Sequence, residues 1–463
     1  MNSYLALLIA YSVALIAIGL WIARRVRRSA DFFVAGRTLN APLLFSTILA
    51  ANIGAGTTIG AAGVGYRDGL SGWWWNGAAA IGSVFLALFV GPRIWRIASK
   101  HNLYTAGDYL ELRYGRAVRG IIAVLIWLGT LSILAGQLIG GAAILSVVAG
   151  IPRTAGIGIS AIVVTSYFVA GGLLSSAWVN VVQLAVKLSA FVVATPIVLA
   201  HVGGFHAIVT TPAAPPTYGE FLYSAGPRSG WTFLMLLGPA FVISPGLLQK
   251  VYGAASDRTV RIGVGAQAIT QALFGFLPPL LGMAARVVQP HISDVNQVLP
   301  MVLMTQLPAS FGALTLAALY SAEVSTCDAI LFMLATSLSQ DLYKRFLRPD
   351  ASDRRLLLVA RLASVAGGIG GVVLALQLRT VVDALSIFYS LLGVSLFVPV
   401  LGGLYTRRAG TPEAIAAIVA GIGVALAAFF APHAAMWWLD PAVAGLVASA
   451  LAFIVVFAVR RPR

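Results

Sequence analysis

The sequence predicts an all-α membrane protein that crosses the bilayer about 13 times. The chain of 463 residues is 59% hydrophobic and only 10% charged, whereas a soluble domain has about 25% charged residues. Apolar runs near the ~20 residues that a spanning helix requires recur along the whole chain. The short alternating segments typical of a membrane β-barrel are absent from the sequence.

Each predicted span is one apolar run that ends at charged, glycine-rich or proline-rich residues. The first run is followed by arginines and has no small-residue cleavage site, which is typical of a membrane helix and not of a signal peptide. The run at 308–341 is long enough to project into the cytoplasm, and 102–115 is expected to form a short interfacial helix. The predicted spans are 3–23, 41–63, 70–95, 117–149, 154–170, 177–201, 231–252, 262–287, 308–341, 356–378, 381–405, 412–431 and 439–459.

The positions of the basic residues predict the orientation. With the N-terminus outside, most Lys and Arg residues fall in inner segments, Lys250 among them, and the C-terminus is cytoplasmic. The outer segments hold only Arg67, Arg153, Arg228, Arg286 and Arg379. This positive-inside pattern accounts for the net charge of +16 without nucleic acid. We expect a multi-pass protein of the inner (plasma) membrane whose basic side attracts anionic lipid.

The sequence lacks the groupings expected of an enzyme or a metalloprotein. The single cysteine, Cys327, excludes an intrachain disulfide. The five histidines are scattered and have no metal-ligand spacing. We find neither a phosphate-binding glycine loop nor a nucleophile–base motif, so the sequence predicts a protein that is not an enzyme.

Two predicted spans contain helix-breaking residues at matching positions. "LAANIGAGTTIGAAGVGY" (49–66) is rich in glycine, and "LLGPAFVISPGLLQK" (236–250) contains two prolines. Each span begins a set of five predicted helices, so the two sets have opposite topology. Interrupted helices at matching positions of inverted repeats point to the substrate site of a transporter. Close helix packing through Gly56-x-x-x-Gly60 is the alternative for the first stretch.

Four segments, taken in this order, resemble the sodium:solute symporter family, which includes bacterial galactose and proline symporters. They are "AANIGAGTTIGAAGVGY" (50–66), "GGLLSSAWVNVVQ" (171–183), "GLLQKVYGAASDRTVR" (246–261) and "SAEVSTCDAILFMLATSLSQDLYKRF" (321–346). The resemblance covers nearly the whole chain and implies a LeuT-type fold with an inverted five-helix repeat. The implied divisions are an extra N-terminal helix with its inner loop at 1–40, the first repeat at 41–202, an outer connection at 203–230, the second repeat at 231–407 and two C-terminal helices at 408–463.

The eighth core helix of this repeat supplies candidate cation ligands. Ala322, Ser325 and Thr326 are spaced i, i+3, i+4 and therefore share one helical face. Hydroxyls in such helices also bond back to the i−4 carbonyl, and that alternative stays open. The resemblance aligns these three residues, with Ala50 and Ile53, with the sodium site of the family. A break in the first helix would free the last two carbonyls, and neutral oxygens suit a hard cation such as Na+.

Polar residues near the two breaks are the candidates for contact with a solute. They are Asn52, Gly54, Gly56, Thr57, Thr58, Ser244, Tyr389 and Ser390. Opposed half-helix N-termini favour an anionic group, so we expect a small organic acid, an amino acid or a similar zwitterion. The candidates for coupling are Asn180, Lys187, Glu323 and Asp328, because such groups are rarely placed at membrane depth without a function.

Structural roles compete with functional ones for several polar residues. An interhelical hydrogen bond is the alternative for Asn180, and Lys187 fits snorkelling or pairing with an acid as well as coupling. Gln137 and Gln183 are interpreted as interhelical bonds. The run Trp73–Trp75 is interpreted most simply as an outer aromatic belt, with an outer-gate contact as the alternative.

The sequence therefore predicts a sodium-coupled symporter that imports a small organic solute by alternating access and works as a monomer. A proton-coupled or uncoupled transporter of the same fold, which would use Glu323 or Lys187 in place of sodium, is the first alternative. A membrane sensor without its own signalling domain is the second.

Overall fold

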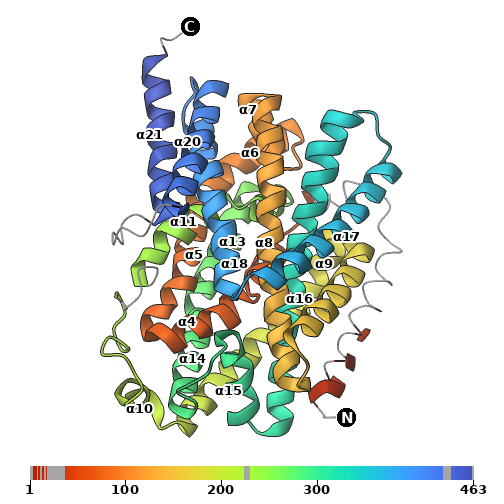
Figure 1. Cartoon of the computed structure of the whole chain (residues 1–463). Helices are drawn as coiled ribbons and strands as arrows, with labels where there is room; N and C mark the ends of the chain where they lie inside the picture. The colour runs from red at the N-terminus through yellow and green to blue at the C-terminus, as the bar shows by residue number, and fades with distance from the viewer. Residues whose placement is uncertain are drawn as a thin grey trace.

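The computed structural model describes residues 37–223, 230–430 and 440–460, together with short stretches between residues 4 and 17. The side chains of residues 167, 169–180 and 182 are outside this description. The described residues form a bundle of helices (Figure 1). The predicted first span, 3–23, falls largely outside the described residues.

The helices are given below in chain order, where η marks a short 3₁₀ or π segment. The first half holds α3 (Ala41–Asn52), η2 (Gly56–Gly60), α4 (Ala61–Asp68), η3 (Gly69–Gly72), α5 (Trp73–Phe85), η4 (Leu86–Val90), α6 (Gly91–His101), α7 (Ala106–Tyr114), α8 (Arg116–Ala149), α9 (Arg153–His201) and α10 (Gly204–Thr210). The second half holds η5 (Gly230–Thr232), α11 (Phe233–Ile243), α12 (Pro245–Tyr252), α13 (Asp257–Phe274), α14 (Leu277–Val288), η6 (Val295–Gln297), α15 (Val298–Gln306), α16 (Ala309–Thr336), η7 (Ser337–Leu347), α17 (Asp353–Gln377), α18 (Val381–Leu392), η8 (Gly393–Phe397), α19 (Val398–Tyr405), α20 (Thr411–Phe430) and α21 (Pro441–Val459).

Ten helical segments among the described residues are long and apolar enough to cross a membrane. Some of them join consecutive helices, since Gly56–His101 includes both α4 and α5. Two shorter apolar helices, Ala41–Asn52 and Arg153–Ser166, accompany them. A polytopic all-α protein is therefore confirmed, whereas the total of 13 spans and the orientation of the termini stay predictions.

The largest difference from the predicted spans lies in α9, which is one continuous helix. The sequence predicts two spans there, 154–170 and 177–201. Apolar segments lie at both places, Arg153–Ser166 and Gln183–His201, and the helix continues between them. Gly171 and Gly172 lie between them, but glycine lowers helix stability by only about 1 kcal/mol and keeps its backbone N–H. Pro196 is the helix's internal proline and lies far beyond this point.

Both predicted helix breaks are present. The first helix stops at Asn52, and Ile53 leaves the helical region with φ −88° and ψ 84°. The chain resumes as the π segment η2, which continues into α4. The second break falls at Ser244, with φ −50° and ψ 123°, and Pro245 starts α12. Proline favours the first position of a helix, where its missing N–H costs nothing, so the sequence fixes where the second half-helix begins.

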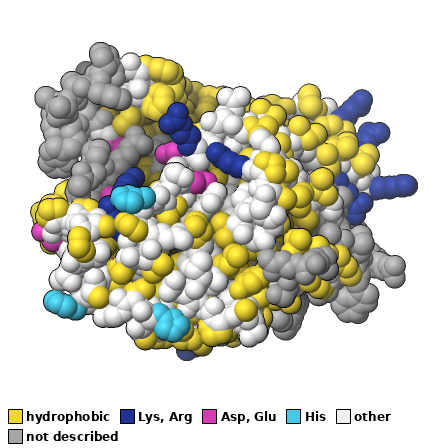
Figure 2. Space-filling model, turned by 60° about the horizontal axis from the view of Figure 1, so that its bottom comes forward, with side chains coloured by type: hydrophobic (Ala, Val, Ile, Leu, Met, Phe, Trp, Pro, Cys, Tyr) yellow, Lys and Arg dark blue, Asp and Glu magenta, His cyan; other side chains and the backbone are white. Residues whose placement is uncertain are grey.

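The predicted inner and outer segments lie at opposite ends of the bundle. Figure 1 shows α7 at the end that carries the last turn of α21, and α10 and α15 at the other end. The helix α7 confirms the short helix expected within 102–115, and Thr105 and Asp108 cap its N-terminus. Figure 2 views the molecule with the α10 end turned forward, and most of the visible surface is hydrophobic or uncharged.

A buried arginine fastens α7 to the rest of the bundle. Arg119 of α8 pairs with Asp108 Oδ1 at 2.7 Å and with Glu111 Oε2 at 2.8 Å. It also pairs with Asp341 Oδ1 of η7 at 2.8 Å. Burial raises the pKa of the Glu111 carboxyl, but hydrogen bonds from Arg119 and Arg345 outweigh burial and hold this pKa below its ordinary value. Glu111 is therefore ionised at neutral pH and completes the network.

Replacing Arg119 by methionine should destabilise the protein. The substitution leaves three carboxylates without their shared cation, and breaking a buried ion pair costs about 3–5 kcal/mol. We expect a melting temperature several degrees lower in detergent. The matched control is Arg258→Met on α13, where the side chain is exposed. Equal melting temperatures for the two variants would contradict this role of Arg119.

Candidate solute and cation site

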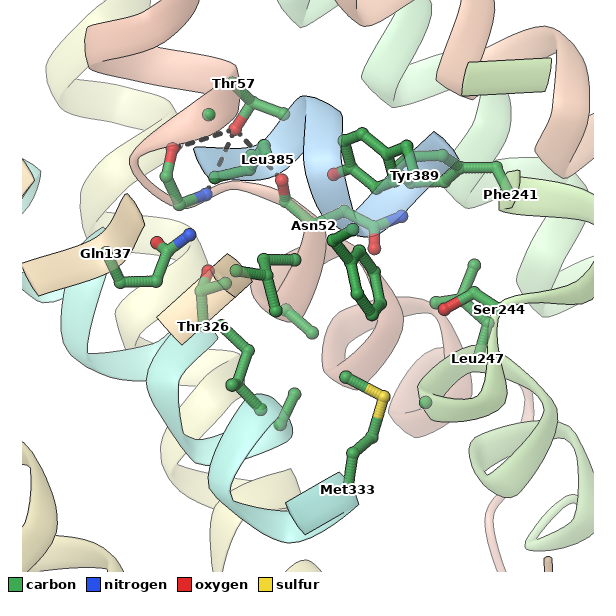
Figure 3. A pocket seen from close by; sticks show the side chains of 18 of the residues that line it. Asn52, Thr57, Gln137, Phe241, Ser244, Leu247, Thr326, Met333, Leu385 and Tyr389 are labelled. Atoms are coloured by element: carbon green, nitrogen blue, oxygen red, sulfur yellow. Dashed lines mark hydrogen bonds between the residues drawn. The ribbon is translucent and has the colours of Figure 1, made fainter. Parts of the chain in front are cut away.

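A buried cavity lies where the two interrupted helices meet (Figure 3). It is lined by both breaks and by α8, α16 and α18. The lining residues are Ala51, Asn52, Gly54, Gly56, Thr57, Ile133, Gln137, Phe241, Ser244, Gly246, Leu247, Lys250, Thr326, Ala329, Ile330, Met333, Leu385, Phe388 and Tyr389.

Most of the predicted solute contacts belong to this lining. The six that line the cavity are Asn52, Gly54, Gly56, Thr57, Ser244 and Tyr389. The other two, Thr58 and Ser390, are not among the lining residues. Thr58 is fully buried, and its hydroxyl donates to Gly54 O at 2.8 Å, so it stabilises the break instead of facing the cavity.

Polar partners satisfy the backbone at the first break. Gln137 Oε1 on α8 accepts a hydrogen bond from Ala55 N at 2.8 Å, which confirms its interpretation as an interhelical bond. The Thr57 hydroxyl accepts from Gly54 N at 3.0 Å and is within 2.9 Å of Asn52 O. These bonds, drawn in part in Figure 3, replace those that a continuous helix would make.

The tryptophan run supports the same break. Trp75 is 1% exposed, and its Nε1 donates to Gly56 O at 2.8 Å. The next residue, Asn76, donates to Thr57 O at 3.1 Å. The interpretation as an outer aromatic belt is therefore wrong for Trp75. The sequence could have indicated this, because successive residues on a helix point in different directions and three adjacent tryptophans on α5 cannot all face lipid.

The oxygens predicted to bind sodium do lie together between α3 and α16. Ser325 Oγ is 3.1 Å from both Ala50 O and Ala322 O. Thr326 Oγ1 is 3.5 Å from Ala50 O. All of these residues are buried.

The Lys187 ammonium of α9 lies among these oxygens. Its Nζ donates to Ala50 O at 2.9 Å, to Ile53 O at 3.1 Å and to Ser325 Oγ at 2.8 Å. The side chain is fully buried. Three predicted ligands therefore already contact an amino group that belongs to the protein. With Lys187 in this position the residues present do not fit a sodium ion, and the alternative in which Lys187 snorkels to the surface is wrong.

The other coupling candidates lie close by, with one exception. Glu323 is buried, and its Oε1 lies 3.4 Å from Thr58 Oγ1 at the first break. Asp328 is buried on the same helix and interacts electrostatically with Lys187 and with Lys250. The side chain of Asn180 lies outside the described residues.

Sequence reasoning missed the cavity's own lysine. Lys250, expected in an inner segment, is 3% exposed, lines the cavity and donates from Nζ to Thr47 O at 2.9 Å. The second break provided the signal, because Lys250 follows Pro245 by little more than one helical turn. The hydrophobic part of the lining, including Phe241, Met333 and Leu385, was also missed, since apolar residues in a membrane helix carry no distinguishing pattern.

Interrupted helices from two halves of a chain that meet at one cavity, lined by apolar side chains and a few polar groups, are typical of a secondary transporter. The sequence model of the sodium:solute symporter family matches residues 32–421. The chain belongs to this family. It is therefore a multi-pass plasma-membrane transport protein and not an enzyme.

Relatives place the chain among symporters of small solutes. It is 26% identical to the sodium/glucose cotransporter of Vibrio parahaemolyticus, over 91% of this chain and 84% of that protein. It is 27% identical to the sodium/pantothenate symporter of Escherichia coli K12, over 97% and 95% of the two chains. Family membership and these relatives support sodium-coupled symport as the class of activity.

A solved structure shows the same fold. The substrate-bound, outward-open form of a Na+-coupled sialic acid symporter matches with a TM-score of 0.82 at 20% identity, over 99% of this chain and 98% of the other. The LeuT-type architecture expected from the resemblance is confirmed at the level of the fold.

An added methyl group at Gly54 should destabilise the break. A Cβ there would overlap Thr326 Oγ1 and lie 2.6 Å from Gln137 Oε1, and overpacking of this kind costs about 1–3 kcal/mol. We expect Gly54→Ala to lower the melting temperature by several degrees. Gly393→Ala is the matched control, because a Cβ at this buried glycine meets nothing within 4 Å. Equal melting temperatures for Gly54→Ala and Gly393→Ala would contradict this prediction, because the break would then tolerate an added methyl group.

Proposed function

We propose that the protein carries a small organic solute across the plasma membrane by alternating access, with the solute bound in the cavity between the two interrupted helices. The observation that carries this proposal is the meeting of both helix breaks at one buried cavity. In this proposal residues 41–202 and 231–407 are the two inverted repeats, 203–230 connects them, and 1–40 and 408–463 are additions. A single copy of the chain performs the cycle.

The charge of the cavity supports a carboxylate as the recognised group. Lys250 is the one charged residue among the described lining residues. The N-terminus of α12 begins at Pro245, beside the cavity, and helix N-termini favour anions. Phe241 and Tyr389 offer apolar surface for the rest of the solute. An organic acid or an amino acid fits this combination, and pantothenate, which is a carboxylate, is chemically closer to it than glucose.

Two observations bear on the identity of the coupling ion, and they point to different answers. Family membership supports sodium. At the site predicted from the sequence, sodium would bind the oxygens of Ala50, Ile53, Ala322, Ser325 and Thr326. The Lys187 ammonium occupies part of that site. This observation favours the alternative in which transport proceeds without sodium at this position. Measured uptake of a solute would favour a transporter over the alternative of a membrane sensor.

Filling the cavity should abolish transport. Met333 is buried and lines it, so Met333→Trp adds a large side chain where the solute binds. We expect purified protein in proteoliposomes to accumulate at least one radiolabelled carboxylate or zwitterion from a panel, and Met333→Trp to reduce the initial rate by at least about tenfold.

The matched control is Met235→Trp, because Met235 is 42% exposed on α11 and does not line this cavity. It should keep the rate of the unaltered protein. A panel that includes neutral sugars tests the solute class. Uptake of sugars alone would contradict recognition of a carboxylate, and unimpaired uptake by Met333→Trp would place the solute elsewhere.

A further inference from the structure

We propose that Lys187 is a tethered cation that permanently takes the place of sodium between α3 and α16, so that this position neither binds nor requires Na+. The effect on ion coupling rests on the proposed transport function. The absence of sodium from this position does not, because it is argued from the contacts of the Lys187 side chain alone.

The contacts of Lys187 are complete for an ammonium group. A lysine Nζ carries three N–H donors, and the structure provides three acceptors at 2.8–3.1 Å. Two are backbone carbonyls at the end of α3, Ala50 and Ile53, which the helix break leaves without helical partners. The third is the Ser325 hydroxyl of α16, which can donate onward to Ala322 O at 3.1 Å. No donor of the ammonium is left over for another group.

A sodium ion cannot share this position with the ammonium. Hard cations bind oxygen at about 2.3–2.6 Å, so an ion on the same three oxygens would lie within van der Waals contact of Nζ. Two positive charges at that separation repel strongly in a buried site. The Ala50, Ile53 and Ser325 ligands are neutral, and therefore they do not compensate a second charge.

Charged neighbours act on the lysine with both signs. Glu323 and Asp328 on α16 attract the ammonium electrostatically, whereas Lys250 on α12 repels it. The contacts with α3 are carbonyl groups only. Two buried carboxyl side chains thus stand near two buried lysines, which is a composition that accommodates Lys187 without an additional cation.

The tether changes what the site does during a transport cycle. A bound sodium ion leaves after it has stabilised one arrangement of α3 and α16, whereas a lysine on α9 stays with the protein. Release of the ion is then not available as a driving step at this position. We expect uptake from a sodium gradient and from a matched choline gradient to differ by less than about twofold.

Melting temperature measures sodium binding directly, without knowledge of the solute. The purified protein in detergent is heated in sodium chloride and in choline chloride of equal ionic strength. The unaltered protein should melt at the same temperature in both salts. Lys187→Ala vacates the oxygens and should melt at least about 2 °C higher in sodium, with a saturable dependence on its concentration.

Two further variants locate the effect. Adding Ser325→Ala to Lys187→Ala removes one oxygen and should abolish the sodium response. Lys250→Ala is the matched control, since it removes a buried lysine that donates to a single carbonyl, Thr47 O, and it should gain no response to sodium.

The proposal is overturned if the unaltered protein shows saturable, sodium-specific stabilisation that Ser325→Ala alone abolishes, because sodium then binds where Lys187 is placed. This comparison needs no folded Lys187 variant. A folded Lys187→Ala that gains no sodium response also overturns it. Failure of the proposed function is a separate result, namely no uptake of any solute on the panel while the sodium response of Lys187→Ala is present.

Discussion

The break in the first core helix is the constraint on which the rest of the site depends. Inside a membrane an unsatisfied backbone amide or carbonyl costs several kcal/mol, so residues 50–56 need partners from outside their own helix. The structure provides them from three directions: Gln137 on α8, Trp75 on α5 and Lys187 on α9. Gln137 and Trp75 each pair with one backbone atom of the break, Lys187 pairs with two, and each partner links its own helix to the wall of the cavity. The cavity is thus the space beside the first break that is left unfilled once these partners have paired with the backbone.

The cost of burying Lys187 is offset by the same broken backbone. A lone ammonium in a low-dielectric interior is strongly unfavourable, and carbonyls released at a helix end carry the partial negative charge of the helix dipole. The C-terminal end of α3 presents such carbonyls at Ala50 and Ile53. At the other break the arrangement is reversed, because the N-terminus of α12 faces the cavity. The two breaks thus present opposite ends of a helix dipole, the C-terminal end of α3 to the Lys187 ammonium and the N-terminal end of α12 to the cavity.

Sequence reasoning located the breaks because glycine and proline act locally. Gly54 frees the backbone and Pro245 constrains it wherever the chain runs, so both interruptions and most of the polar residues that line the cavity could be predicted. The occupant of the cation position could not, because a lysine in an apolar span fits snorkelling, pairing or coupling until its neighbours are known. Trp75 was misassigned for the same reason: its partner, Gly56, lies on another helix. The continuity of α9 could not be predicted, because Gly171 and Gly172 lower helix stability without forbidding a helix.

The separation between the oxygens and their occupant explains why family membership alone does not determine the coupling ion. The oxygens come from α3 and α16, and two of the three that contact Lys187 are backbone atoms that no side-chain substitution removes. The chain can therefore keep the whole oxygen arrangement and the fold of a sodium symporter. One position on a different helix, α9, decides whether these oxygens hold an exchangeable ion or a fixed charge, because its side chain either leaves the space open or fills it. In this chain the residue is Lys187, whose three N–H donors match the three oxygen acceptors.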